Sequence, residues 1–194
     1  MSSTNRGYNR HKSDYYITPQ IEIEKFLYCF QYDILQKSTE YMQELKYLDP
    51  CCGGDAQNDA SYLSVLKDYY EPDNIIGIDI REDSKADIYT DYLNFQTTHK
   101  YDIIISNPPF YLAEDFIAKS LKHITKEGYV IMLLRLNFFG SKKRKKLFEN
   151  NMPKYCFVHH KRISFNKIST DSIEYAHFVW VKDNKDNFCK TFVI

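Results

Sequence analysis

The sequence lacks the cysteine patterns of metal centres and disulfide frameworks. No C-x-x-C pair occurs, and no histidine stands at zinc-ligand spacing from a cysteine. The five cysteines are Cys29, Cys51, Cys52, Cys156 and Cys189. We therefore expect no metal site, and a reducing compartment, the cytoplasm.

Long apolar segments are also absent. The first residues are polar, and the longest apolar run, residues 129–139, is short and interrupted by Arg135. Neither a membrane-spanning helix nor a secretion signal is predicted, so we expect no membrane partner. With 194 residues and no repeat, low-complexity tract or linker, the chain has the usual size of one domain. We expect a flexible, basic arm at residues 1–13 and a single domain at residues 14–194.

Net charge is absent too, but the charges are unevenly distributed along the chain. Residues 1–118 contain 10 Lys and Arg against 20 Asp and Glu, whereas residues 119–194 contain 16 against 6. A basic C-terminal portion suits a polyanion such as a nucleic acid, and an acidic N-terminal portion suits a cationic ligand. Solvated surface charge would give the same composition, so both interpretations stay open.

Alternating strand and helix patterns predict an α/β fold. Three short apolar runs end in acidic or polar residues, and a fourth is apolar enough for a central strand. The predicted strands are 47–49, 75–79, 101–106 and 128–136, and helical patterns cover 21–35, 61–70 and 112–123. Two β-prone runs, 154–160 and 174–182, predict an antiparallel hairpin at the sheet edge. We therefore expect an open, mostly parallel sheet with helices packed against it.

Ligands of such sheets bind beyond the carboxyl ends of the strands. The first strand leads into Asp49-Pro50-Cys51-Cys52-Gly53-Gly54, where paired glycines allow a tight turn and a close approach to a ligand. This turn has neither the G-x-G-x-x-G of dinucleotide binding nor the Gly-Lys-Ser/Thr of a P-loop. The second strand ends at Asp79, whose carboxylate suits the two hydroxyls of a ribose. An ordinary strand-to-helix turn and a helix cap are the structural alternatives.

The third strand end, Asn107-Pro108-Pro109-Phe110, is the most specific feature of the sequence. The two prolines fix φ and hold the preceding Asn107 in an extended conformation. The amide oxygen of Asn107 and the carbonyl of Pro108 can then accept both protons of an amino group, which localises the lone pair on its nitrogen. Phe110 can stack on the base that carries this amine. A simple strand terminator is the alternative.

These motifs, in this order and spacing, resemble the class I S-adenosylmethionine-dependent amino-methyltransferases, especially the N6-adenine DNA methyltransferases. Segments 134–144, 161–165 and 170–176 are similar to a small phage-type branch, so the likeness covers nearly the whole chain. The resemblance implies a Rossmann-like class I methyltransferase fold: a seven-stranded, mostly parallel sheet with an antiparallel C-terminal hairpin and helices on both faces. It also implies S-adenosylmethionine as cofactor and direct in-line methyl transfer to the N6 amine of a flipped-out adenine in DNA.

The resemblance also implies roles for individual residues. The catalytic residues would be Asn107, Pro108, Pro109 and Phe110. The cofactor-binding residues would be Tyr16, Thr18, Asp49, Pro50, Cys51, Gly53, Asp79, Ile80, Asp91, Tyr92 and Asn107. Within this set, Asp49 and Gly53 would line the methionine end of the cofactor, Asp79 its ribose and Asp91 its adenine. Thr18 would donate to the methionine carboxylate, or it simply caps the following helix with Pro19 in the first turn.

A run of basic residues follows the last predicted parallel strand. Lys142, Lys143, Arg144, Lys145 and Lys146 are predicted to contact phosphates, which would give affinity rather than sequence choice. A solvated helix face is the alternative. The residues after Phe110 are mostly used by the core, which leaves no room for a separate target-recognition domain. Sequence selection is then expected from loops, from this basic segment, from a dimer partner or from another protein.

Four functions remain in view from the sequence. Adenine in DNA is the leading acceptor, in the cytoplasm of a prokaryote or a phage-infected cell. Enzymes that methylate amino groups of RNA also carry Asn-Pro-Pro-Phe. A glutamine side-chain amide of a protein suits the same geometry, although such enzymes more often have Tyr at the position of Phe110. A catalytically silent partner that keeps the fold is the last alternative.

Overall fold

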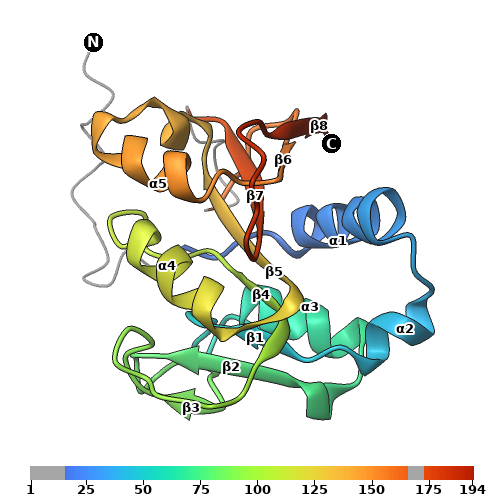
Figure 1. The fold of residues 1–194 in the computed structure, drawn as a ribbon. Helices are drawn as coiled ribbons and strands as arrows, with labels where there is room; N and C mark the ends of the chain where they lie inside the picture. The colour runs from blue at the N-terminus through green and yellow to red at the C-terminus, as the bar shows by residue number, and fades with distance from the viewer. Residues whose placement is uncertain (1–15, 166–172) are drawn as a thin grey trace.

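The computed structural model describes residues 16–165 and 173–194. The predicted arm at residues 1–13 and part of the phage-like segment 170–176 lie outside these ranges. An eight-stranded sheet forms the centre of the described structure (Figure 1). Its strands are β1 (Tyr47–Asp49), β2 (Ile75–Asp79), β3 (Ile88–Tyr89), β4 (Tyr101–Ser106), β5 (Ile124–Arg135), β6 (Tyr155–Val158), β7 (Tyr175–Val181) and β8 (Lys190–Val193).

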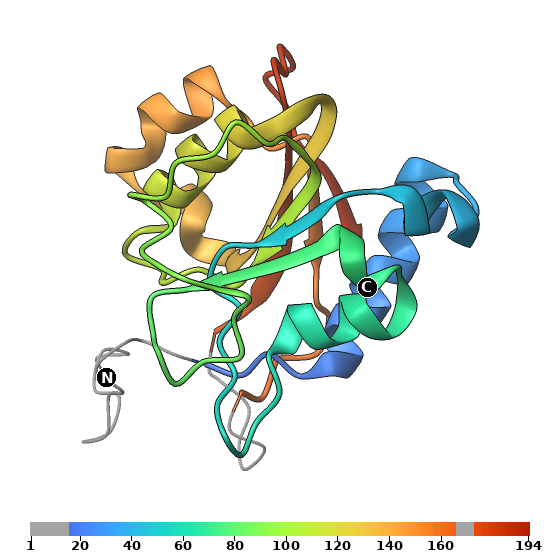
Figure 2. The ribbon, with the colours of Figure 1, turned by 90° about the horizontal axis from the view of Figure 1, so that it is seen from below.

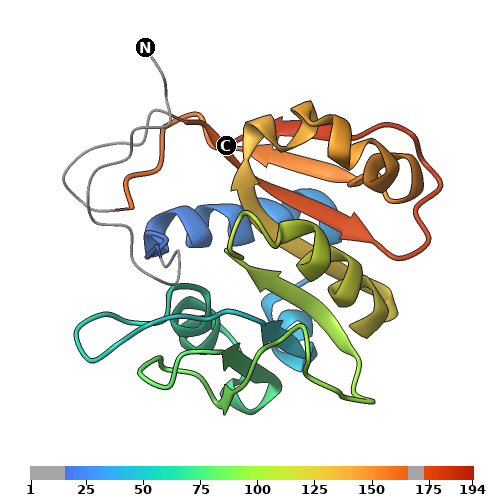
Figure 3. The same cartoon turned by 90° about the vertical axis from the view of Figure 1, so that its left-hand side faces the viewer.

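The strand order is β3-β2-β1-β4-β5-β7-β6-β8, with five parallel strands followed by an antiparallel part. Neighbouring strands from β3 to β5 are parallel, and β7 runs antiparallel to both β5 and β6 (Figure 3). Because the chain leaves β1 toward β2 on one side and later returns to β4 on the other, the order reverses between β1 and β4. Open α/β sheets bind their ligands at such a reversal.

The antiparallel pairing predicted for the C-terminal strands is present, but its place at the sheet edge and the predicted number of strands differ in the structure. β6 and β7 do pair antiparallel, as expected. However, the outermost strand is β8, which pairs parallel to β6 and brings the sheet to eight strands rather than seven. β8 is only four residues long, and its partner β6 lies more than thirty residues earlier in the chain. No local sequence pattern therefore predicts that the two strands pair.

Helices cover both faces of the sheet (Figure 2). One face packs against α1 (Gln20–Cys29) and α3 (Ser61–Tyr69), and the other against α4 (Ala113–His123) and α5 (Lys145–Asn150). α1 fits the first face because its apolar residues recur at helical spacing, and Ile23, Phe26 and Leu27 are buried. A short helix, α2 (Thr39–Glu44), precedes β1.

The start of the first helix differs from one of the two sequence predictions. α1 begins at Gln20, and no side chain caps it; the backbone N–H of Glu22 donates to the carbonyl of Pro19 at 3.1 Å. Thr18 therefore does not act as the cap. The α-helix ends at Cys29, and a π-helical turn, Phe30–Leu35, completes the predicted helical segment. Gln36 then stops the helix in a left-handed conformation, at φ 52°.

The turn after β1 requires glycine at its second glycine position. Gly54 has φ 81°, and a Cβ there would lie 3.0 Å from the backbone nitrogen of Ala60. We expect Gly54→Ala to lower the free energy of unfolding by about 1–2 kcal/mol, because an L side chain is strained in this conformation. Urea denaturation measures this change. Gly140→Ala is the matched control, since a Cβ at Gly140 meets nothing within 4 Å. Equal losses in the two variants would contradict the assignment.

Candidate active site

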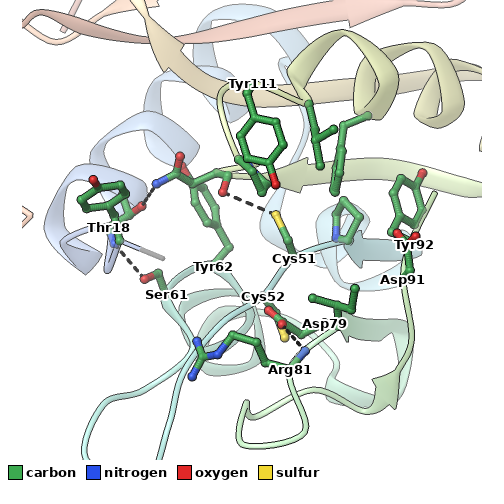
Figure 4. A pocket seen from close by; sticks show the side chains of 17 residues that line it. Thr18, Cys51, Cys52, Ser61, Tyr62, Asp79, Arg81, Asp91, Tyr92 and Tyr111 are labelled. Atoms are coloured by element: carbon green, nitrogen blue, oxygen red, sulfur yellow. Dashed lines mark hydrogen bonds between the residues drawn. The ribbon is translucent and has the colours of Figure 1, made fainter. Parts of the chain in front are cut away.

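A cavity of about 290 Å³ opens at the carboxyl ends of β1, β2 and β4, where the strand order reverses. Nine of the eleven predicted cofactor residues line it: Tyr16, Thr18, Pro50, Cys51, Asp79, Ile80, Asp91, Tyr92 and Asn107. Pro109 of the predicted catalytic set lines it as well. The fold thus brings these residues, from five separate segments of the chain, around one space (Figure 4).

Asp79 is held in place by the backbone on both sides of it. Its Oδ2 accepts the N–H of Gly53 at 2.8 Å, and its Oδ1 accepts the N–H of Arg81 at 2.8 Å. Each carboxylate oxygen keeps a further lone pair for a ligand. Gly53 itself does not line the cavity; at φ 68° it turns the chain so that its N–H reaches Asp79. The contribution of Gly53 in this structure is therefore to orient Asp79.

Asp49 is fully buried and does not line the cavity, unlike its predicted position beside the methionine end. Its Oδ1 accepts the hydroxyl of Ser106 at 2.6 Å and the N–H of Cys51 at 3.3 Å, whereas Oδ2 has no partner among the described residues. Burial raises the pKa of Asp49 to about 7, against the lowering effect of these two hydrogen bonds. Cys51 stands between Asp49 and the cavity, and burial together with Asp49 raises the pKa of its thiol, so that it stays neutral.

Asn107 is tied to the segment that precedes α1. Its Nδ2 donates to the Oγ1 of Thr18 at 3.1 Å, and the N–H of Thr18 donates to the hydroxyl of Ser61 at 3.0 Å (Figure 4). Thr18 is 1% exposed. Thr18 therefore anchors the N-terminal segment at the cavity wall, and its predicted contact with the methionine carboxylate stays a prediction.

Asp91 and Tyr92 form the wall near α4. The carboxylate of Asp91 accepts the N–H of Leu93 at 2.9 Å and the amide of Asn94 at 2.6 Å, which fixes the turn that follows. The hydroxyl of Tyr92 hydrogen-bonds with Ser120 at 3.0 Å. Both side chains are thereby oriented before any ligand binds.

Phe110 faces a different space from Asn107. Phe110 lines a second cavity of about 310 Å³ together with Arg135 and Arg144. Pro108, which lies between Asn107 and Phe110 in the chain, is buried. The guanidinium carbon of Arg135 lies 4.6 Å from the centre of the Phe110 ring, and the Tyr175 ring centre lies 5.9 Å away. The Nε of Arg135 is buried and has no acceptor among the described residues. The tetrapeptide therefore contributes to two cavities, with Asn107 and Pro109 at the first and Phe110 at the second.

The basic segment divides into two kinds of residue. Lys142, Lys143, Lys145 and Lys146 are exposed, and Lys145 also pairs with Glu149 at 3.6 Å. Arg144 instead donates to Glu114 at 3.2 Å and to the carbonyl of Phe138 at 3.1 Å, with its guanidinium over the Phe138 ring. The guanidinium of Arg144 is therefore used by contacts with Glu114 and Phe138. The prediction of phosphate contacts remains for the four exposed lysines.

Seven residues that line the cavity were not predicted from the sequence: Cys52, Ser61, Tyr62, Arg81, Tyr111, Leu112 and Phe116. Several of them adjoin recognised motifs: Arg81 lies two residues after Asp79, and Tyr111 directly follows Phe110. Ser61 and Tyr62 open α3, the helix that follows the glycine turn. Proximity to a strand end was therefore a usable signal for them, whereas Phe116 lies one turn inside α4.

Comparisons with known proteins identify this architecture. No protein-family model matches the chain, and no curated protein sequence matches it. Among solved structures, a protein described as a class I S-adenosylmethionine-dependent methyltransferase from Listeria monocytogenes superposes with a TM-score of 0.64 at 15% identity. The chain has the class I methyltransferase fold. That match covers 92% of this chain and 65% of the Listeria protein.

Two further methyltransferase structures match the chain and differ in how much of their own length the match covers. A protein described as an RNA methyltransferase, PH1948 from Pyrococcus horikoshii, has a TM-score of 0.60 at 15% identity, and the match covers 93% of this chain and 94% of PH1948. The M protein of the type I restriction enzyme EcoKI has a TM-score of 0.56 at 13% identity, with 78% of this chain and 44% of its own covered. The matched part of the chain therefore covers less than half of the EcoKI M protein.

S-adenosylmethionine is the cofactor expected of this class I methyltransferase fold, and the residues of the first cavity fit it. The ligand carries a positive sulfonium, and the cavity is lined by the carboxylates of Asp79 and Asp91. The spare lone pairs of Asp79 suit ribose hydroxyls. Among the described residues, no group of His, Cys, Asp or Glu is arranged to hold a metal ion, and no helix is long and apolar enough to cross a membrane.

The raised pKa of Asp49 predicts a pH dependence of stability. Because the folded state holds its proton up to about pH 7 while the unfolded state releases it near pH 4, stability falls as the pH rises between these values. We expect Asp49→Asn to remove this decline and to be more stable than the wild type above pH 7 by a few kcal/mol. Urea denaturation at pH 5 and pH 8 checks it; parallel pH profiles of the two proteins would show that Asp49 stays ionised.

Proposed function

We propose that the protein transfers a methyl group from S-adenosylmethionine to the exocyclic N6 amine of adenine in DNA. The observation that carries the proposal is the position of Asn107-Pro108-Pro109-Phe110 between two cavities. Asn107 lines the cavity whose carboxylates fit the cofactor, and Phe110 lines the one beside the basic segment. An amine held at this tetrapeptide would thus lie between methyl donor and nucleic acid.

Asn107 supplies the acceptor for the amine. Its Nδ2 is used by Thr18, and no described residue donates to its Oδ1, so that oxygen is available to a substrate N–H. With the carbonyl of Pro108 as a second acceptor, both amine protons are held in the base plane and the nitrogen lone pair points out of it. When bound, S-adenosylmethionine would supply an electrophilic methyl group; Asn107 and Pro108 would hold the amine, which would lose one proton to solvent as it gains the methyl group.

The second cavity supports a nucleic acid base as the carrier of the amine. The ring of Phe110 and the guanidinium of Arg135 offer stacking surfaces, and the unsatisfied Nε of Arg135 offers a hydrogen-bond donor. Four exposed lysines, at 142, 143, 145 and 146, lie in the 3₁₀ turn η4 (Lys142–Arg144) and in α5, next to Ser141 and Arg144, which line this cavity. These features favour a base within a phosphate-bearing strand over a protein glutamine.

An amino group of RNA is the second candidate acceptor. PH1948, described as an RNA methyltransferase, matches this chain over nearly the full length of both, whereas the type I M protein is more than twice as long as the matched part. We propose that the described residues take part in target selection through loops and the basic segment, together with a dimer partner or an auxiliary protein.

The deciding experiment incubates the purified protein with labelled S-adenosylmethionine and equal pools of DNA and RNA, followed by mass spectrometry of the nucleosides. N6-methyladenine from DNA is the expected product. Label in RNA alone would move the acceptor to RNA. Label in neither pool would overturn the proposal and direct attention to a protein acceptor or to a catalytically silent partner of another subunit.

We expect Asn107→Ala to lower kcat by at least a hundredfold while the Kd for S-adenosylmethionine changes less than threefold, since the amide aligns the amine rather than the cofactor. Single-turnover methylation and calorimetric titration measure the two quantities. Asp79→Ala is the converse variant and should weaken cofactor binding, because Asp79 faces the ribose position. Equal losses of kcat and affinity in Asn107→Ala would place that residue at the cofactor instead.

The exposed lysines predict a salt-dependent affinity for nucleic acid. We expect Lys143→Ala combined with Lys146→Ala to lower the slope of log affinity against log salt concentration by about 0.9 for each lost phosphate contact. Fluorescence anisotropy with a labelled duplex measures the slope. Lys37→Ala combined with Lys46→Ala removes the same charge from the region around α2, on the other side of the molecule from α5 (Figure 1). The same slope change in this control would show a nonspecific charge effect.

A further inference from the structure

Cys51 lies between the two residues of the first cavity that would hold the ends of the reaction. The strand order places β1 between β2 and β4, so the turn after β1 lies between the ends of these two strands. Asp79 ends β2, Cys51 lies in the turn after β1, Asn107 directly follows β4, and all three line the cavity. Cys51 is near the middle of the lining side chains (Figure 4). A ligand that reaches from a ribose at Asp79 to an amine at Asn107 must therefore pass Cys51.

The side chain of Cys51 is held by contacts within the cavity wall. Its Sγ lies 2.9 Å from the hydroxyl oxygen of Ser106 and 3.4 Å from the backbone carbonyl oxygen of Asn107. The hydroxyl of Ser106 donates to Oδ1 of Asp49 at 2.6 Å, and the N–H of Cys51 donates to the same oxygen at 3.3 Å. Ser106 and Asp49 are fully buried. Asp49, Ser106 and Cys51 thus form one connected group that ends at the cavity.

The thiol hydrogen of Cys51 points into the wall. Ser106 has a single hydroxyl hydrogen, which goes to the carboxylate when Asp49 is ionised. The oxygen of Ser106 is then an acceptor, as the carbonyl of Asn107 always is, so one of these two oxygens takes the thiol hydrogen. The lone pairs of the sulfur are left for the cavity. Burial and the charge of Asp49 raise the pKa of this thiol, so the sulfur is electron-rich but neutral.

The carboxylate of Asp49 lies behind the sulfur and is not neutralised by the protein. None of the ion pairs of the described residues includes Asp49, and its Oδ2 has no hydrogen-bond partner among them. Charges interact more strongly at a buried position than in water. A positive charge bound beside Cys51 would therefore be stabilised by this carboxylate, whereas a neutral group in the same place would not.

These properties match the part of the cofactor that changes in a methyl transfer. S-adenosylmethionine carries a positive sulfonium, whereas the product S-adenosylhomocysteine carries a neutral sulfide and shares the other parts. We propose that Cys51 determines the specificity of the cavity for the sulfonium: its sulfur lone pairs contact this group, Ser106 orients the thiol, and Asp49 supplies the opposite charge. The cavity would then bind the cofactor in preference to the product. The inference rests on the cofactor of the proposed function and not on its acceptor.

Calorimetric titration with S-adenosylmethionine and with S-adenosylhomocysteine tests the inference without any assay of methylation. The full chain is used at pH 8, where Asp49, whose pKa burial raises to about 7, is mostly ionised. The ratio of the two Kd values is the readout, because contacts with the parts that both ligands share cancel in it. We expect Cys51→Ala to lower the preference for S-adenosylmethionine about fivefold, which corresponds to the loss of one charge-assisted contact.

Three further variants separate the lone pairs and the charge from other effects. Asp49→Asn removes the charge and should lower the preference for S-adenosylmethionine about as much as Cys51→Ala does. Cys51→Ser keeps a hydrogen for the wall and lone pairs for the cavity, so it should retain most of the wild-type preference. Cys52→Ala is the matched control: the thiol of Cys52 lies 3.9 Å from the carbonyl oxygen of Gly53, and its removal should leave the ratio unchanged.

An unchanged ratio in Cys51→Ala or in Asp49→Asn would overturn the inference. A loss in Cys51→Ser as large as that in Cys51→Ala would also overturn it, because it would show that the volume of the side chain matters and not its lone pairs. If the wild-type protein binds neither ligand, the cofactor assignment fails, and the inference fails with it. Binding of both ligands with no methylation of DNA or RNA would contradict only the proposed acceptor, and the Kd ratios would still decide the role of Cys51.

Discussion

Two buried carboxylates hold the ends of three neighbouring strands in register, and the cavity depends on them. Asp49 at the end of β1 accepts the hydroxyl of Ser106 at the end of β4, and Asp79 at the end of β2 accepts the N–H of Gly53 in the turn after β1. Backbone hydrogen bonds continue past the strand ends, from the N–H of Cys52 to the carbonyl of Ile78 and from the N–H of Lys85 to the carbonyl of Gly53, and the two aspartates add side-chain contacts to them. Both aspartates are buried, and hydrogen bonds are stronger where water is excluded.

The N-terminal segment closes the cavity from outside the sheet. The hydrogen bond between Thr18 and Asn107 joins residues 89 positions apart, and Ser61 holds the backbone of Thr18 on the other side. The proposed catalytic amide is therefore supported by a segment that belongs to no strand. This arrangement makes the geometry of the site sensitive to the packing of α1, which directly follows this segment.

The sequence was most informative where local chemistry determines structure. Strand ends at Asp49, Asp79 and Ser106 were predictable, because apolar runs that stop at polar residues mark where a buried strand emerges. Side-chain direction was less predictable: successive strand residues face opposite sides, so a one-residue difference separates a buried Asp49 from a cavity wall. The contact between the buried His159 and His177 and the pairing of β8 with β6 join distant segments, and no periodicity of the sequence encodes such contacts.

The contact between Arg135 and Phe110 affects which acceptors can bind. One face of the Phe110 ring is already covered, since the guanidinium lies 4.6 Å from its centre. A base that stacks on that face must exchange places with the guanidinium, and it gains only the difference between two similar stacking free energies. A small aliphatic amine has no ring to offer in this exchange and leaves the ring covered. Under the proposed function, the covered ring would therefore favour flat, extended acceptors over small aliphatic amines.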